Sequence, residues 1–249
     1  MKLTSLLDRA LFYLSVPKCV GCGARLAYGE LAFCPECSAV FEDSKTRNCS
    51  VCSRVLSECD CSSDLLEKHK IKRVLKVFRY IPREENAIPN SLIFSLKQDN
   101  RRDVIRRSAD ELSAAIRNSG IDLSDFVITT IPRRTKARIK YGFDHSEQLA
   151  REIAHRFGAT YLRTMRSKAR LAQKSLHGSE RTENIHFIPR NKIDLAKRKV
   201  LIVDDVITTG TSMSVAADVL KGLGASELIA ASLSIAYKDK YVPFEYTEF

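Results

Sequence analysis

The residues best suited to chemistry in this 249-residue chain lie together between Val200 and Ser212. Four apolar residues, Val200 to Val203, have the pattern of a strand buried on both faces of a parallel sheet. Asp204 and Asp205 follow where this strand should end, and a hydroxyl-rich loop comes next. Loop N–H groups and the N-terminus of a following helix favour an anion. Carboxylates beside such a loop accept hydrogen bonds from ribose hydroxyls or bind Mg2+. The segment therefore predicts a site for a sugar phosphate.

This segment resembles the ribose-phosphate-binding motif of type I phosphoribosyltransferases, which is an apolar strand followed by Asp-Asp, two residues and Thr-Thr-Gly-Thr. We expect the helix to run from Met213 to Leu223 and to end at Gly224. The resemblance implies phosphoribosyl pyrophosphate as the ligand, bound with Mg2+. The two aspartates are also the catalytic candidates. The ribose-phosphate residues it implies are Asp204, Asp205, Thr208, Thr209, Gly210, Thr211 and Ser212. The alternative is a buried strand followed by a polar turn.

The length and the net charge of the chain limit its number of domains and the kinds of partner it can have. A chain of 249 residues can bury the core of one large or two smaller domains. No apolar run is long enough to cross a bilayer, so we expect no membrane insertion. The apolar segment Leu3 to Val16 contains Asp8 and Arg9, which favours a short amphipathic helix over a signal peptide. The net charge of +11 points to a polyanionic partner or to anionic substrates.

All eight cysteines lie within the first quarter of the chain. No secretory signal is evident, so disulfides are not expected and paired cysteines favour metal. Two Cys-x-x-Cys knuckles present four thiolates to one tetrahedral zinc ion. The second set is less regular because its last pair is Cys-x-Cys, and cross-braced pairing stays open. A redox pair is disfavoured, since no βαβ unit surrounds it. We predict one or two structural zinc ions, on Cys19, Cys22, Cys34 and Cys37 and on Cys49, Cys52, Cys59 and Cys61.

The rest of the chain alternates strand and helix patterns. Strands are expected at residues 73–80, exposed on one face, and at 126–131, and helices at 86–97, 103–117 and 147–157. Such βα units predict an α/β fold, a doubly wound parallel sheet with its ligand outside the carboxyl ends of the strands. A polar linker at 62–70 suggests two parts. Residues 1–65 would form an N-terminal helix and double zinc ribbon, and residues 71–249 a phosphoribosyltransferase-like domain.

Two polar segments are candidates for the pyrophosphate side of the site. Residues 133–140 form a basic loop after the 126–131 strand, which should lie close to the Val200 strand. Residues 164–189 have little hydrophobic periodicity and would suit a lid that closes over the ligand. The alternatives are a solvated loop and a disordered one. His145 is a candidate general base, with an exposed loop histidine as the alternative. The pyrophosphate and lid candidates are Arg133, Arg134, Arg138, Gln173 and Arg181.

The order of these parts resembles the ComF/GntX family, a double zinc ribbon fused to a type I phosphoribosyltransferase-like domain. The features that carry the resemblance are the cysteine knuckles, Arg79-Tyr80, Leu96-Lys97, Pro132, Tyr141-Gly-Phe-Asp144, the Gln173 to Asn184 segment and the Asp-Asp loop. Two features depart from the family pattern. Tyr141-Gly-Phe-Asp-His145 stands where the family has Arg-Gly-Phe-Asn-Gln, and the last cysteine pair is shortened.

The resemblance implies a cytoplasmic bacterial protein of DNA uptake, with single-stranded DNA and a DNA-uptake helicase as partners. The basic stretches Lys70 to Lys76, Lys97 to Arg107 and Arg133 to Lys140 agree with a nucleic-acid partner. Two alternatives remain, because one fold serves several functions. One is a transferase of nucleotide salvage or purine metabolism, although an amidotransferase would need a free cysteine. The other is a regulator that senses ribose phosphates, for which the sequence shows no helix-turn-helix.

Overall fold

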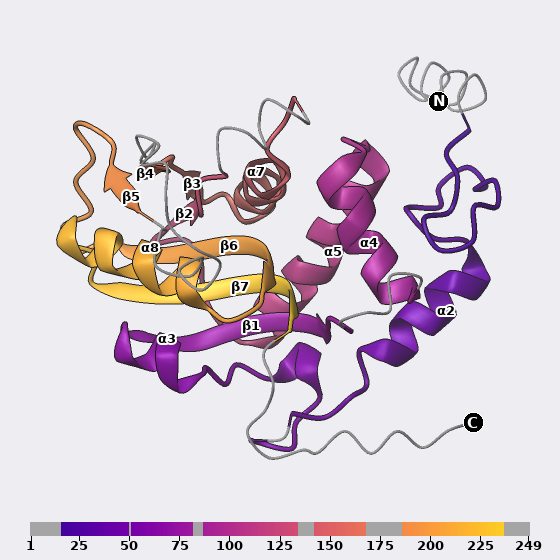
Figure 1. The fold of residues 1–249 in the computed structure, drawn as a ribbon, viewed down its shortest axis with the longest axis horizontal. Coiled ribbons are helices and arrows are strands. Elements are labelled where there is room, and N and C mark those ends of the chain that lie inside the picture. The colour runs from indigo at the N-terminus through magenta and orange to yellow at the C-terminus, as the bar shows by residue number, and fades with distance from the viewer. Residues whose placement is uncertain (1–15, 50, 82–86, 134–141, 168–185, 237–249) are drawn as a thin grey trace, which may run out of the picture.

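The computed structural model describes residues 16–49, 51–81, 87–133, 142–167 and 186–236. Its centre is a five-stranded sheet in the order β1-β7-β6-β2-β3, with every neighbouring pair parallel (Figure 1). This confirms the predicted parallel α/β sheet. The strands are β1 (Ile71–Arg79), β2 (Phe126–Thr130), β3 (Thr160–Tyr161), β6 (Lys199–Ile207) and β7 (Glu227–Ile235).

Helices cover both faces of the sheet, and this explains why its central strands are apolar throughout. On one face, α4 (Ile88–Gln98), α5 (Arg102–Asn118) and α7 (His145–Phe157) pack in a single apolar cluster with alternate residues of the strands. On the other face, α3 (Asp64–Lys68) and α8 (Thr211–Gly222) pack in a second cluster. A separate antiparallel hairpin pairs β4 (Met165–Ser167) with β5 (Phe187–Pro189). Both strands lie within residues 164–189, the segment predicted as a lid or a disordered loop, so the two ends of that segment are paired; residues 168–185 between them lie outside the described residues.

The cysteine-containing segment packs directly against this α/β body. It holds α2 (Pro35–Ser44) and the short 3-10 helix η1 (Leu56–Glu58). On α2, the ring of Phe41 meets that of Phe78 of β1 edge-on, with 5.3 Å between the ring centroids. Cys19, Cys34 and Cys37 belong to the apolar cluster of one sheet face, and Cys49 and Cys59 to that of the other. The two cysteine sets are therefore seated on opposite faces.

Two expectations about the start of the sheet were wrong. Strand β1 is not exposed on one face, because η1, α3 and the second cysteine set cover it. Lys76, expected to face solvent, is 1% exposed, and its Nζ donates a hydrogen bond of 2.7 Å to the carbonyl oxygen of Cys61. The predicted polar linker at 62–70 contains helix α3, whose Leu66 is fully buried. A single buried leucine in a polar stretch is too weak a pattern to indicate a helix.

The remaining elements lie close to their predicted positions. Helix α7 begins at His145, two residues earlier than expected, because the side chain of Asp144 caps it by accepting a hydrogen bond from the N–H of Glu147. Gly224 follows the end of α8 with a φ of +92°, as expected of a helix stop. The predicted N-terminal helix falls mainly on residues 1–15, outside the described residues. In the described part of the chain, no helix has the length and apolar character needed to cross a membrane.

Candidate functional site

The paired carboxylates lie inside strand β6, not at its end. The strand continues to Ile207, so Asp204 and Asp205 lie among its last four residues, near the carboxyl edge of the sheet. Successive residues of a strand face opposite sides. Asp205 is 6% exposed, whereas Asp204 is partly exposed. The backbone N–H of Asp205 donates a hydrogen bond of 3.0 Å to Oδ1 of Asp204. The pair is thus held close to the body of the fold.

Two cationic or ionisable side chains converge on Asp205. The Nζ atom of Lys97, at the end of α4, is 2.9 Å from its Oδ2 atom. The Nε2 atom of His145, at the start of α7, is 3.3 Å from the same oxygen. His145 is 5% exposed, so the alternative of an exposed loop histidine was wrong. Ser146 donates from its hydroxyl to Oδ1 of Asp204 over 3.3 Å. Three elements distant in sequence therefore meet at the carboxylate pair.

The environment shifts the pKa values of the two carboxyl groups in opposite directions. Burial and the neighbouring charge of Asp205 raise the pKa of Asp204 well above its usual range. Burial also opposes ionisation of Asp205, but hydrogen bonding and charge from His145 and Lys97 outweigh it and lower its pKa. Asp205 therefore ionises more readily than Asp204, and a further cation such as a metal ion would favour the ionised form of both.

The predicted phosphate loop lies directly beyond these carboxylates. Gly210 is the residue before α8 and has a φ of +82°, a conformation that favours glycine. A Cβ atom at this position would come within 3.2 Å of Cδ2 of Leu66 on α3. The Oγ1 atoms of Thr209 and Thr211 are 2.9 Å apart, and Thr208 and Thr209 are exposed. The loop thus presents hydroxyls and the N-terminus of a twelve-residue helix to solvent.

Of the predicted pyrophosphate residues, the structure describes Arg133. It follows β2, which lies beside β6 as predicted. Its guanidinium donates to the carbonyl oxygens of Phe143 and Lys97, at 3.2 and 3.4 Å. Arg133 therefore ties the end of β2 to the end of α4, on the side where Lys97 reaches Asp205. The other predicted residues, Arg134, Arg138, Gln173 and Arg181, lie outside the described residues.

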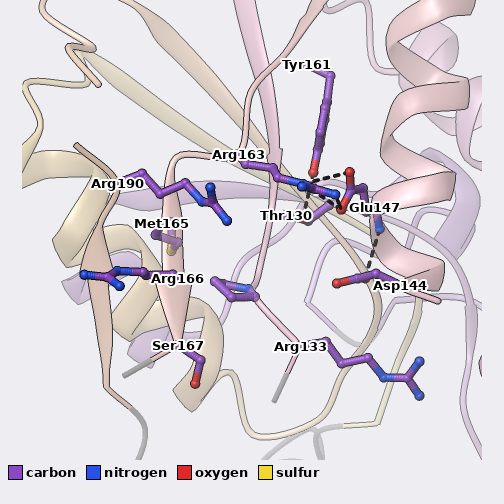
Figure 2. Close-up of a pocket in the computed structure, with 11 residues that line it drawn as sticks. Thr130, Arg133, Asp144, Glu147, Tyr161, Arg163, Met165, Arg166, Ser167 and Arg190 are labelled. Atoms are coloured by element: carbon purple, nitrogen blue, oxygen red, sulfur yellow. Dashed lines mark hydrogen bonds and ion pairs between the residues drawn. The ribbon is translucent and has the colours of Figure 1, made fainter. Parts of the chain in front are cut away.

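A cavity of about 220 Å³ opens next to this edge, between α7, the end of β2 and the β4–β5 hairpin (Figure 2). Arginine residues dominate its lining, and the sequence analysis had not singled out Arg163, Arg166 or Arg190. Arg166 and Arg190 fall in or beside a hairpin whose strands are three residues long, too short to read from periodicity. The charged residues that line the cavity are Arg133, Asp144, Glu147, Arg163, Arg166 and Arg190.

The eight cysteines form two separate tetrads with the pairing predicted first, not a cross-braced one. In each tetrad, the four sulfur atoms lie within 4.8 Å of one another. The Sγ atoms of Cys22 and Cys34 are 3.7 Å apart, and those of Cys52 and Cys59 are 3.5 Å apart. A tetrahedral zinc ion with bonds of about 2.3 Å separates its sulfur ligands by roughly 3.8 Å. Both tetrads can therefore hold a zinc ion, and the shortened Cys-x-Cys pair completes the second.

The surroundings of the tetrads suit a metal centre with four thiolates. Burial opposes ionisation of Cys52, yet hydrogen bonds from the backbone of Arg54 and from neighbouring thiols lower the pKa of Cys52 to about 6. The N–H groups of Val51 and Cys61 point at the sulfur atoms of Cys49 and Cys59, 3.4 Å away in each case. Donors to sulfur and a buried lysine beside Cys61 offset the negative charge of a zinc–tetrathiolate centre.

Comparison with known proteins agrees with the fold. The model of the phosphoribosyl transferase domain matches residues 105–246, more than half of the chain. The protein belongs to the phosphoribosyl transferase domain family. Its two N-terminal tetrads give it the arrangement of the ComF/GntX proteins, as the sequence indicated. The DNA utilization protein YhgH of Escherichia coli strain K12 is 27% identical over 218 residues, which cover 86% of this chain and 95% of that protein. The YhgH protein of Salmonella typhimurium is 24% identical over the same length.

The matches among solved structures include phosphoribosyltransferases. A purine phosphoribosyltransferase from Pyrococcus horikoshii is 21% identical, with a TM-score of 0.34 over 58% of this chain and 90% of that one. A hypoxanthine phosphoribosyltransferase from Staphylococcus aureus is 16% identical, with a TM-score of 0.37 over 57% of this chain and 75% of that one.

Proposed function

We propose that this protein binds phosphoribosyl pyrophosphate together with Mg2+ at the carboxyl edge of β6. The observation that carries the proposal is the placement of Asp204 and Asp205 immediately before a hydroxyl-rich loop that opens helix α8. The loop would bind the 5-phosphate through its N–H groups and hydroxyls. The carboxylates would bind the ribose hydroxyls and Mg2+, and the metal would offset the negative charge of the pyrophosphate.

The residues around the carboxylates support this assignment. Two neighbouring carboxylates at a sheet edge repel each other. Here Lys97 and His145 both contact Asp205 and favour its ionised form. Mg2+ would supply the missing positive charge to Asp204, whose pKa is raised in its absence. Arg133 lies close enough to this edge to face the pyrophosphate side. Transfer of the phosphoribosyl group to an acceptor would then depend on electrostatic stabilisation, as the domain family implies.

Calorimetric titration with phosphoribosyl pyrophosphate tests the proposal, in the presence and absence of Mg2+. We expect binding that requires Mg2+ and is lost in the double variant Asp204→Asn/Asp205→Asn. The matched control is Asp125→Asn, an exposed carboxylate just before β2 at the opposite edge of the sheet. Equal affinity of the double variant and the control would contradict the proposed site. Pyrophosphate release with candidate acceptors then separates a transferase from a protein that binds the ligand without turnover.

A second function, binding of single-stranded DNA, is favoured by the similarity to DNA utilization proteins and by the net charge of +11. Several basic residues of the predicted stretches are not available to bind DNA. Lys76 is buried, Lys97 pairs with Asp205, and Arg107 pairs with acidic residues on α2 and α5. The basic side chains of the predicted stretches that remain exposed in the described residues are Lys70, Lys72, Arg102 and Arg106.

Gel retardation of a labelled oligonucleotide at rising salt tests this second function. Backbone binding should weaken with a log–log slope of roughly −0.7 per phosphate engaged on a single strand. The double variant Arg102→Gln/Arg106→Gln should flatten the slope by about one to two such contacts. No retention at low salt would exclude DNA binding and leave the small-molecule function.

A further inference from the structure

The arginine-lined cavity has the size and position of a subsite for a small ring. Its volume of about 220 Å³ is below the roughly 300–1,000 Å³ of pockets for drug-sized ligands, so it suits a single-ring compound. Thr130, in its lining, is in register with Val203, the residue before Asp204. Ser146 contacts Asp204, and its helix neighbour Glu147 lines the cavity. A ligand in the cavity would therefore lie beside a ribose held at the carboxylate pair.

The acidic residues of the cavity are already committed to contacts within the protein. Glu147 accepts hydrogen bonds from Nε of Arg163, at 2.9 Å to each carboxylate oxygen, and from Nε of Arg151 at 2.8 Å. Asp144 caps helix α7. Both carboxylates therefore have partners, and Glu147 alone is shared by two arginines. The four arginines of the lining exceed these two acids, so the cavity carries a net positive charge.

Two of the arginines come from one face of the β4–β5 hairpin. Arg166 lies opposite Ile188, and the N–H of Arg190 bonds the carbonyl oxygen of Thr164, so Arg166 and Arg190 form a diagonal pair on that face. Within the described part of the chain, neither side chain has a carboxylate within ion-pair distance. Figure 2 shows Arg190 extending from the hairpin toward the side of the cavity where Arg163 pairs with Glu147. In the same view, the Arg166 side chain extends the other way, so Arg190 is the one of the two that faces Arg163. A guanidinium group without a carboxylate partner favours an anion.

We propose that this cavity binds a single-ring ligand through an oxyanion carried on the ring, a carboxylate above all. The planar guanidinium group matches a carboxylate with two parallel hydrogen bonds, which a neutral amide cannot reproduce. Among the described residues, Arg190 supplies a guanidinium group that has no carboxylate partner, and Arg163, held in place by Glu147, lies across the cavity from it. The proposal rests on the proposed function, because it assigns the class of compound that lies next to the bound phosphoribosyl group.

The test compares two probes that differ only in a carboxylate or an amide on the same ring, nicotinate and nicotinamide. Calorimetry is carried out on the full-length, zinc-loaded protein with and without phosphoribosyl pyrophosphate and Mg2+. We expect nicotinate to bind at least about tenfold more tightly than nicotinamide. Arg190→Gln should remove most of this preference. The matched control is Arg198→Gln, an exposed arginine beside the opposite edge of the sheet, just before β6. It should leave the preference unchanged.

The outcomes separate this proposal from the one on which it rests. If phosphoribosyl pyrophosphate binds but nicotinate has no advantage over nicotinamide, the anionic subsite is wrong and the proposed function stands. If nicotinate binds with the expected arginine dependence but phosphoribosyl pyrophosphate does not, the subsite stands and the proposed function fails. Competition with inorganic phosphate tests whether the arginines bind a phosphate group and not a ring carboxylate. Displacement of nicotinate by equimolar phosphate would show that the arginines bind a phosphate group and would overturn the assignment of a ring carboxylate.

Discussion

The Nζ atom of Lys97 lies 2.9 Å from the Oδ2 atom of Asp205, across more than one hundred residues of sequence. Lys97 ends helix α4, and Asp205 belongs to strand β6. The contact fixes the distance between the end of this helix and the carboxyl edge of the sheet. It also keeps Asp205 ionised, so the helix takes part in setting the charge of the candidate site.

Replacing Lys97 by methionine should destabilise the protein without removing its fold. Asp205 would keep His145 but lose its cationic partner, which costs about 1–3 kcal/mol for a buried charged group. Loss of the cation also raises the pKa of Asp205 toward the value in the unfolded chain. The ionised form stabilises the fold only above the folded pKa, so acid unfolding should begin at a higher pH in the variant. Urea unfolding between pH 3 and pH 7 measures both effects. Lys197→Met, at an exposed lysine, is the control, and equal losses in the two variants would contradict the role of the ion pair.

The two aspartates should respond in opposite directions when each is replaced by asparagine. The pKa of Asp204 is raised by burial and by Asp205, so its ionisation opposes folding at pH 7. Asp204→Asn should therefore increase the free energy of unfolding at pH 7, by about 1 kcal/mol. This gain should shrink as the pH falls toward the ordinary aspartate pKa, because the unfolded state then also begins to bind the proton. The pKa of Asp205 is lowered by His145 and Lys97 despite its burial, so Asp205→Asn should reduce stability at pH 7 by about 1–3 kcal/mol.

Urea unfolding of the zinc-loaded variants at pH 7 and pH 5 gives the sign of each effect and the decrease of the Asp204→Asn gain with falling pH. Both variants should weaken binding of phosphoribosyl pyrophosphate, so ligand binding and stability change together for Asp205 and in opposite directions for Asp204. Equal destabilisation by the two substitutions would show that the carboxyl groups share one environment, contrary to the distinct contacts of Lys97 and Ser146.

Much of the fold was predictable because its elements carry strong local patterns. The apolar runs of β2 and β6 indicate buried parallel strands, and the periodicity of α5 indicates an amphipathic helix. The burial of β1 was not predictable. Its alternation of basic and apolar residues matches a strand that is exposed on one face, and the pattern cannot show that the second cysteine set helps to cover that face. In the sequence, Lys76 has the pattern of a surface lysine. The hydrogen bond that buries it goes to the backbone carbonyl of Cys61, which the sequence pattern does not place beside it.

The candidate site was predictable where one continuous segment builds it. Asp204, Asp205 and the loop before α8 were found from their order in the chain. Lys97 and Ser146 were not assigned to the site, because they reach it from α4 and α7 and no local pattern marks them. Leu96-Lys97 was noted as a helix end, which was the signal available for Lys97. Arg166 and Arg190 come together through a hairpin that is defined by tertiary structure and not by periodicity.

The purified protein should contain two zinc ions per chain, because both tetrads have the spacing of a four-sulfur site. Elemental analysis should give one zinc ion in Cys22→Ser and one in Cys52→Ser, and each variant serves as the control for the other. The tetrads rest on opposite faces of the sheet, so loss of one should leave the other metal in place. A single zinc ion in the unmodified protein would contradict this prediction. The division of the chain into residues 1–65 and 71–249 stays a prediction, which limited proteolysis after chelation would test.

Gly210 offers a test of the link between the second cysteine set and the phosphate loop. Helix α3 follows that set, and Leu66 of α3 packs under Gly210, while Nδ1 of His69 lies 2.7 Å from Oδ1 of Asp218 on α8. Gly210→Ala would place a side chain at a φ of +82°, which costs about 1–2 kcal/mol. It would also press the new Cβ against Leu66, 3.2 Å away. We expect lower stability and weaker binding of phosphoribosyl pyrophosphate.

Gly222 is the matched control because it is the last residue of α8, the helix that Gly210 precedes, and a Cβ there would meet nothing within 4 Å. Gly222→Ala should raise the free energy of unfolding by roughly 0.5–1 kcal/mol, since alanine loses less backbone entropy in a helix than glycine does. Thermal unfolding and calorimetry on both variants measure the two effects. If Gly210→Ala bound the ligand as well as Gly222→Ala does, the backbone at Gly210 would not form the phosphate cradle. The support that α3 gives to the loop would then have no part in ligand binding.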